Sequence, residues 1–201
     1  MTVLFGGTFD PVHNGHVWAV SAILKELPDI KRFIIMPAFV NPFKQGAVQG
    51  AAPEERLEMC RAVFGRFPVC EVSSYEIDAG CVSYTYNTLM YLREKYPDEQ
   101  LVLAVGGDSL ATLGKWYKAK EILETAVIAA VRRDDELPLD GYADRLRHMG
   151  GDVRIIDTGA VVVSSTQVRS LLLRGLSADD LIPAEAAAYI REKGLYDIQH
   201  G

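Results

Sequence analysis

The fold is decided by Gly6-Gly7-Thr8-Phe9-Asp10-Pro11-Val12-His13-Asn14-Gly15-His16, which follows a short apolar run at residues 3–5. That run indicates a buried strand, and apolar residues then recur at helical spacing from Val17 to Leu27. The stretch therefore joins the carboxyl end of a strand to a helix whose expected N-cap is Asn14. Backbone N–H groups and the helix dipole make such a junction an anion site, most often for phosphate. Because His13 and His16 would face that anion, the sequence predicts a phosphate-handling site.

The rest of the chain alternates strand-like apolar runs with helical patterns. We expect strands at residues 3–5, 33–36, 69–72, 101–105, 127–131 and 153–156, and helices near residues 15–27, 54–65, 84–95, 119–124, 141–148, 166–174 and 184–193. Apolar strands separated by helices indicate an α/β fold, a doubly wound parallel sheet covered by helices on both faces. Ligands of such sheets bind at the carboxyl ends of the strands, where the strand order reverses. The first strand–helix junction would be such a place.

Two connections are expected to be loops. Residues 41–53 hold glycines and alanines without any period, and a loop of that length in a compact domain is often functional. Residues 132–152 mix charges with Pro138 and Gly141, and we expect an exposed excursion that carries a short helix.

Composition and charge limit the classes of protein to which the chain can belong. The chain has 201 residues, of which 49% are hydrophobic and 24% charged, with a net charge of −6. This balance is globular, and an acidic chain without basic clusters is a poor candidate for binding nucleic acid. No apolar run approaches the ~18 residues of a membrane span, and the first residues lack the pattern of a signal peptide. The three cysteines match no metal or redox spacing, so we expect reduced thiols in a cytoplasmic protein. The oligomeric state stays open.

A second informative segment is Val163-Ser164-Ser165-Thr166-Gln167-Val168-Arg169, at the start of the helix expected over 166–174. A hydroxyl side chain at this position caps a helix, which alone would explain the segment. The same geometry offers hydroxyls and backbone N–H groups to a second anion. Arg169 lies about one turn inside the helix, where its guanidinium can grip phosphate oxygens.

Together the two motifs resemble the His-x-Gly-His nucleotidyltransferase superfamily, in its nicotinate mononucleotide adenylyltransferase branch. The first stretch matches the superfamily signature, and Ser164-Ser165-Thr166-Gln167-Val168-Arg169 is similar to the Ser-Ser-Thr-x-Ile/Val-Arg motif of that branch. The resemblance spans essentially the whole chain, although only these two motifs are highly specific. Weaker similarities lie in Pro37–Lys44, in Ser83–Leu89, in Leu103–Leu110 with Trp116 beyond, in Val127–Val131 with Arg132-Arg133, and in the ending from Ile182 to Tyr196. Phe43 stands where the branch has His, and Asn87 where it has an acid.

The resemblance implies a single Rossmann-like nucleotidyltransferase domain over residues 1–201, with a C-terminal helical segment from about residue 166. It implies adenylyl transfer from ATP to nicotinate mononucleotide, with Mg²⁺ bound largely through ATP oxygens and water and with no dedicated metal ligands. The catalytic residues implied are His13, His16, Lys44 and Arg169. The residues implied for ATP are Gly6, Gly7, Thr8, Phe9, His13, Gly15, His16, Gly106, Asp108, Ser164, Ser165, Thr166 and Arg169. Those implied for nicotinate mononucleotide are Thr8, Lys44, Tyr84, Thr85, Trp116 and Arg132.

Several alternatives stay open at this point. The acceptor can instead be nicotinamide mononucleotide or, less in keeping with the second motif, phosphopantetheine. A nucleotide-binding regulator without catalysis is a further alternative, although such a protein is expected to lose a histidine and this chain keeps both. A last alternative is that His13 and His16 form half of a zinc site, but no third ligand stands at a recognisable spacing.

Overall fold

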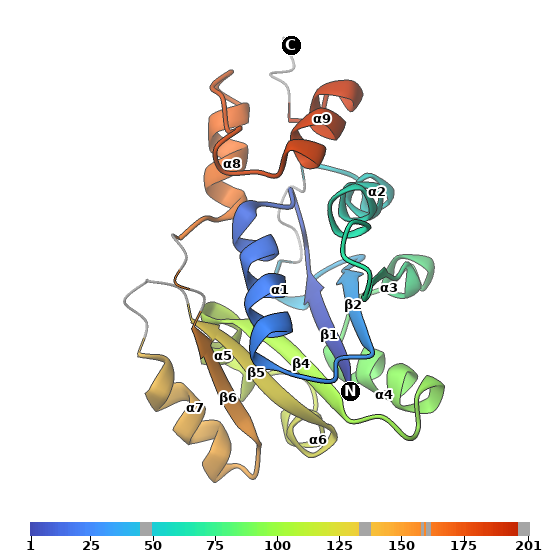
Figure 1. Cartoon of the computed structure of the whole chain (residues 1–201), viewed down its shortest axis with the longest axis vertical. Helices are drawn as coiled ribbons and strands as arrows, with labels where there is room; N and C mark the ends of the chain where they lie inside the picture. The colour runs from blue at the N-terminus through green and yellow to red at the C-terminus, as the bar shows by residue number, and fades with distance from the viewer. Residues whose placement is uncertain (45–49, 133–137, 158, 160–161, 197–201) are drawn as a thin grey trace.

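The chain folds around one parallel sheet. The computed structural model describes residues 1–44, 50–132, 138–157, 159 and 162–196. Within that part, the strands are β1 (Thr2–Gly7), β2 (Arg32–Pro37), β3 (Cys70–Val72), β4 (Leu101–Gly106), β5 (Ala126–Arg132) and β6 (Val153–Asp157). They pair in the order β3-β2-β1-β4-β5-β6 (Figure 1). This is the doubly wound order, so the predicted fold class and all of the predicted strands are confirmed.

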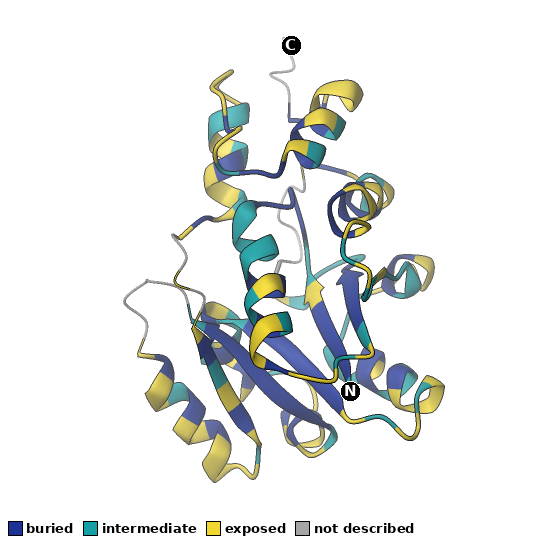
Figure 2. Ribbon diagram, viewed as in Figure 1, coloured by how far each residue is buried: buried dark blue, intermediate teal, exposed yellow. Residues whose placement is uncertain are grey.

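Helices cover both faces of the sheet. Their bounds are α1 (Asn14–Glu26), α2 (Pro53–Phe64), α3 (Tyr75–Asp78), α4 (Thr85–Lys95), α5 (Gly107–Leu113), α6 (Ala119–Thr125), α7 (Leu139–His148), α8 (Ser165–Leu172) and α9 (Ala184–Lys193), with a 3₁₀ turn, η1 (Pro42–Lys44). Val3 and Phe5 of β1 pack with α1, α2, α8 and α9, whereas Leu4 packs with α4, α5, α6 and α7. The period of two along the strand thus places side chains in two cores, one on each face of the sheet, and most residues of β1, β2, β4 and β5 are buried (Figure 2).

The central strands separate at one end. β1 pairs with β4 only as far as Phe5 and Ala104, although β1 continues to Gly7 and β4 to Gly106. Beyond that point β1 stays paired with β2, and β4 with β5. The neighbours therefore diverge at the switch point of the sheet, which opens a crevice between their carboxyl ends.

Two predictions on local structure were wrong. His13, and not Asn14, is the N-cap of α1, because the backbone of His13 is extended and Asn14 is the first helical residue. The side-chain amide of Asn14 instead donates to the carbonyl of Asp180 at 3.0 Å. The short helix expected after β5 is present as α7, but Leu139 and Leu146 bury it against the sheet, so it is not exposed as predicted. Residues 133–137 of the same segment lie outside the described residues. The part of the other expected loop at residues 45–49 lies outside the described residues.

Two helices were missed altogether. α3 has four residues, too few for an apolar period to stand out, and α5 begins directly after β4, without a loop between them. The helices of the described residues include none with the length and apolarity needed to cross a membrane.

Candidate active site

A cleft of about 800 Å³ opens where β1 and β4 separate. It is lined by the ends of both strands, by the first turn of α1, by the start of α8, and by residues 83–85 and 115–117. Its volume lies within the range of about 300–1,000 Å³ that is usual for small-molecule sites. The crevice predicted from the first motif is therefore present, and elements from both halves of the chain form it.

The two histidines of the first motif lie against each other in this cleft. Their rings stack with centroids 3.7 Å apart at an angle of 24°. The backbone N–H of His13 donates to Nδ1 of His16 at 3.1 Å. Because Nδ1 of His16 is an acceptor, the neutral ring carries its proton on Nε2, which makes that atom a hydrogen-bond donor.

Phe9 supports this pair from the core side. The residue adopts a positive φ of 53°, its ring is buried, and the ring centroid lies 4.8 Å from that of His16. Gly15 allows the close approach of His13, since a Cβ on Gly15 would lie 3.0 Å from the His13 ring. Phe9, predicted to bind ATP, is thus a packing residue in the structure and does not line the cleft.

The second motif starts α8 on the same cleft. Ser164 is the N-cap, and its Oγ accepts the backbone N–H of Gln167 at 3.1 Å, as predicted. The hydroxyl of Ser165 donates to the carbonyl of Pro11 at 3.0 Å, which attaches the start of α8 to the first motif. Ser164, Ser165 and Thr166 all line the cleft together with the histidines. The two motifs therefore meet, as the sequence predicts.

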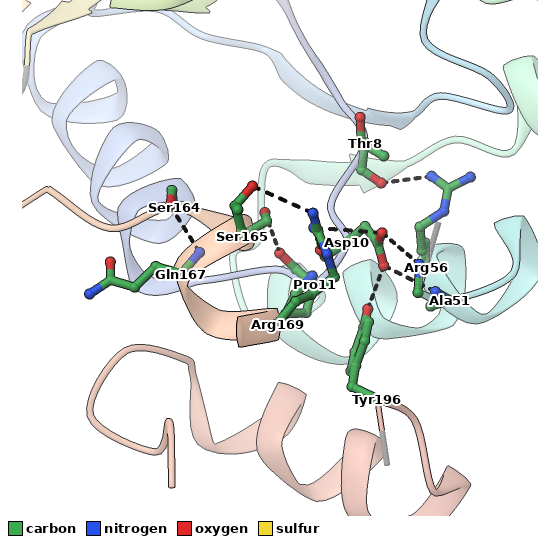
Figure 3. A network of polar contacts seen from close by, with 12 residues as sticks. Thr8, Asp10, Pro11, Ala51, Arg56, Ser164, Ser165, Gln167, Arg169 and Tyr196 are labelled. Atoms are coloured by element: carbon green, nitrogen blue, oxygen red, sulfur yellow. Dashed lines mark hydrogen bonds and ion pairs between the residues drawn. The ribbon is translucent and has the colours of Figure 1, made fainter. Parts of the chain in front are cut away.

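Arg169 lies differently from the prediction. Its guanidinium donates to the backbone carbonyl of Asp10 and lies 3.7 Å from the Asp10 carboxylate (Figure 3). A further contact of 3.4 Å joins it to Oγ1 of Thr166. Arg169 is not among the residues that line the cleft. In this structure the Arg169 guanidinium therefore contacts the first motif outside the cleft. To bind a phosphate in the cleft, the Arg169 side chain has to change its conformation.

Arg56 is a buried cation that the sequence analysis missed. Its guanidinium donates to the carbonyls of Thr8 at 2.6 Å and Phe39 at 3.2 Å, and burial lowers its pKa. It therefore ties the first motif to the end of β2. A signal was available, because Arg56 stands four and seven positions before Cys60 and Val63 on the apolar stripe of α2.

The residues predicted for the acceptor divide into two groups. Tyr84, Thr85 and Trp116 line the cleft, and Trp116 is half-buried as expected. The exposed ring of Phe43 lies 6.2 Å from that of Trp116, measured between centroids. Arg132 does not line the cleft and pairs with Asp140 and Asp157 at 2.7 and 3.5 Å.

The remaining predicted residues follow the strand ends. Gly6, Gly7 and Thr8 line the cleft at the end of β1, and Gly106 and Asp108 line it at the end of β4. A Cβ on Gly106 would meet no protein atom within 4 Å, so this strand end faces open space. Lys44 belongs to η1, and its side chain lies outside what the structure describes.

Glu76 is a second missed residue, a buried carboxyl in the wall of the cleft. It accepts the hydroxyl of Thr88 at the start of α4 and that of Ser83, whose Oγ accepts the backbone N–H of Phe39 at 3.0 Å. Burial raises the pKa of Glu76 despite these donors. The carboxyl thus links the two segments that the resemblance assigns to the acceptor.

Comparison with known proteins places this site in a family. The cytidylyltransferase-like family matches residues 4–171. A "probable nicotinate-nucleotide adenylyltransferase" of Chlorobaculum parvum is 37% identical over 97% of this chain and 98% of its own length. Another, from Hydrogenobaculum sp., is 31% identical over 96% of each chain. The solved Plasmodium falciparum nicotinic acid mononucleotide adenylyltransferase, complexed with NaAD, shares the fold, with a TM-score of 0.79 at 16% identity over 97% of this chain and 96% of that one. The chain belongs to the cytidylyltransferase-like family and, within it, to the nicotinate-nucleotide adenylyltransferases.

Proposed function

We propose that the protein transfers the adenylyl group of ATP to nicotinate mononucleotide, giving deamido-NAD and pyrophosphate, a step of NAD biosynthesis. The observation that carries the proposal is that the stacked His13–His16 pair and the start of α8 line one cleft. Two anion sites of this kind suit a triphosphate and a phosphate-bearing acceptor. The relatives that match nearly the whole chain bear the name of this activity.

The reaction needs positioning more than proton transfer. An oxygen of the acceptor 5′-phosphate attacks the α-phosphorus of ATP, and a new P–O bond forms as the bond to the β-phosphate oxygen breaks. Pyrophosphate leaves with the electron pair, and no covalent enzyme intermediate forms. Because the nucleophile is already an anion, the site supplies alignment and charge stabilisation.

The geometry of His16 suits it to the α-phosphate. With Nδ1 occupied by the N–H of His13, its Nε2–H is the atom that can donate to a non-bridging oxygen as negative charge develops. His13 is assigned to orienting ATP and its leaving group, and Thr8 to holding phosphate oxygens. The hydroxyl of Ser165 is engaged by Pro11, so Ser165 and Thr166 serve phosphate through the first N–H groups of α8.

The cations complete the assignment. Arg169 and Lys44 offset the charge of the triphosphate and of the acceptor, for which Arg169 must leave Asp10. Trp116 stacks on the pyridine ring, next to Tyr84 and Thr85. Arg132 remains assigned to the acceptor phosphate, which would compete with Asp140 and Asp157 for the guanidinium.

Mg²⁺ is proposed to enter as the complex with ATP. No group of three or more His, Cys, Asp or Glu side chains is gathered to hold a metal among the residues that the structure describes. Asp108 and the open strand end at Gly106 are assigned to ATP itself, and the ion would be held mainly by ATP oxygens and water. When bound, the ion would neutralise charge on the leaving pyrophosphate.

Product analysis tests the proposal. The purified protein is incubated with ATP and Mg²⁺ and with either nicotinate or nicotinamide mononucleotide, and the dinucleotide and pyrophosphate are quantified. We expect deamido-NAD with a clear preference in kcat/KM for the acid. A preference for the amide would move the protein to the sister specificity, and no product from either acceptor would overturn the proposal. Omitting Mg²⁺ with EDTA present is expected to abolish turnover.

A further inference from the structure

The carboxylate of Asp10 is buried in the first motif and does not line the cleft. It accepts the backbone N–H groups of Gly50 at 3.0 Å and Ala51 at 3.1 Å, and the hydroxyl of Tyr196 at 2.7 Å (Figure 3). Its oxygens are therefore taken up by donors from two remote segments of the chain. A carboxylate in this position has no access to substrate, so its contribution to the reaction is to hold the motif.

Tyr196 is fixed tightly in its place beside Asp10. The ring is buried, and the backbone of Tyr196 adopts a positive φ of 62°, which is unfavourable for a residue with a bulky side chain. A Cβ on Gly50 would lie 2.4 Å from Cε1 of the Tyr196 ring, so no other residue fits at position 50 without displacing it. Burial and the neighbouring Asp10 raise the pKa of the Tyr196 hydroxyl, which keeps it a donor.

The same aspartate connects to the catalytic motifs. Its backbone carbonyl accepts Arg169 of the second motif, and the next residue, Pro11, accepts the hydroxyl of Ser165. His13 follows three positions after Asp10, with no regular element between them. Any shift of Asp10 is therefore passed to the histidine pair and to the start of α8.

We propose that Tyr196 is a positioning residue for adenylyl transfer: its hydroxyl holds Asp10, and Asp10 sets the alignment of His13 and His16 against the phosphates. The inference rests on the proposed function. Without the hydroxyl, a buried carboxylate loses one of its donors and the loop that carries the histidines relaxes. Small displacements of catalytic groups reduce the rate of the chemical step more than they reduce the binding of substrates.

Tyr196→Phe tests this with the loss of a single oxygen atom. We expect kcat to fall about tenfold while KM for ATP and for nicotinate mononucleotide stays within about twofold. Tyr189→Phe is the matched control, since Tyr189 lies on nearby α9, is half-buried, and has its ring against Lys193. Because the hydroxyl acts through Asp10, Asp10→Asn combined with Tyr196→Phe should be no slower than Asp10→Asn alone.

The outcomes separate the two proposals. No product from the wild-type chain overturns the proposed function, and the inference with it. An active wild-type chain with an equally active Tyr196→Phe variant, additive losses in the double variant, or an equal loss in Tyr189→Phe overturns the inference alone. If Tyr196→Phe does not fold, Gly50→Ala is measured instead: its Cβ displaces the ring, so the same selective fall in kcat is expected, and an unchanged kcat counts against the inference.

Discussion

The ring of His16 lies between two aromatic neighbours, stacked on His13 with centroids 3.7 Å apart and tilted over Phe9 at 4.8 Å. The hydrogen bond from the backbone N–H of His13 makes Nδ1 of His16 the acceptor, so that the neutral ring carries its proton on Nε2. The imidazole is therefore oriented before any substrate arrives, which is the condition for stabilising charge without reorganisation.

We expect His16→Ala to lower kcat by roughly 10²–10³, the scale of losing one donor to a developing charge. Steady-state rates of pyrophosphate release measure it. His148→Ala, at the end of α7 and remote from the cleft, is the control and should keep the wild-type rate. A His16→Ala variant within threefold of the wild-type rate would refute the assigned role.

Gly15→Ala should also slow the reaction, because the added Cβ would lie 3.0 Å from the His13 ring and push it out of alignment. A loss of about tenfold in kcat is expected. Gly141→Ala provides the comparison: a Cβ there meets nothing within 4 Å in α7, so it should raise the free energy of unfolding by about 0.5–1 kcal/mol and leave kcat unchanged. Equal rates in the two variants would contradict the close-approach argument.

Trp116→Ala is expected to raise KM for nicotinate mononucleotide and to leave KM for ATP near its wild-type value. Loss of stacking on an aromatic base costs about 1–3 kcal/mol, which corresponds to roughly 5- to 150-fold. Isothermal titration with each substrate separately would show the same selectivity. An equal weakening for both substrates would remove Trp116 from the acceptor site.

Glu76 should make stability depend on pH. Burial raises its pKa in the folded chain, so between the ordinary glutamate range and that higher value the folded state binds more protons than the unfolded state. Stability contributed by the protonated form is then lost as pH rises through the folded pKa. Because glutamine does not titrate, Glu76→Gln should become relatively more stable than the wild type with rising pH.

Thermal unfolding of both proteins from pH 4.5 to 8 measures this difference. Glu94→Gln, on an exposed position of α4, is the control and should track the wild type. Parallel curves for wild type and Glu76→Gln would show that the Glu76 carboxyl titrates alike in both states.

Arg56→Ala should reduce the free energy of unfolding by about 3 kcal/mol, because it leaves the carbonyls of Thr8 and Phe39 without their buried donor and opens a cavity. Arg61→Ala on the same helix removes only an exposed ion pair with Glu58 and should cost less than about 0.5 kcal/mol. Chemical denaturation with urea compares the two. Similar losses would mean that the buried contacts of Arg56 contribute little.

The sequence predicts the features that depend on residues close to one another in the chain. The strands, the longer helices and the meeting of both motifs at the switch point follow from patterns of two and 3.6 residues and from the strand-to-helix junctions. The orientation of Arg169 does not follow, because its partner Asp10 lies 159 positions away. The contact between Asp10 and Tyr196 spans 186 positions, and no local pattern encodes such a pair. Arg56 and Glu76 were missed because a charged residue is expected to be exposed to solvent unless its buried partners are known.

That longest contact has a consequence for the order of assembly. The histidine motif follows β1, yet Tyr196, the residue that holds it, is synthesised 186 positions after Asp10. During translation β1 to β6 can therefore pair before Tyr196 is available to donate its hydroxyl to Asp10. The histidine motif therefore gains this contact only after β1 to β6 have been synthesised, and a chain interrupted between β6 and Tyr196 would carry the motif without it.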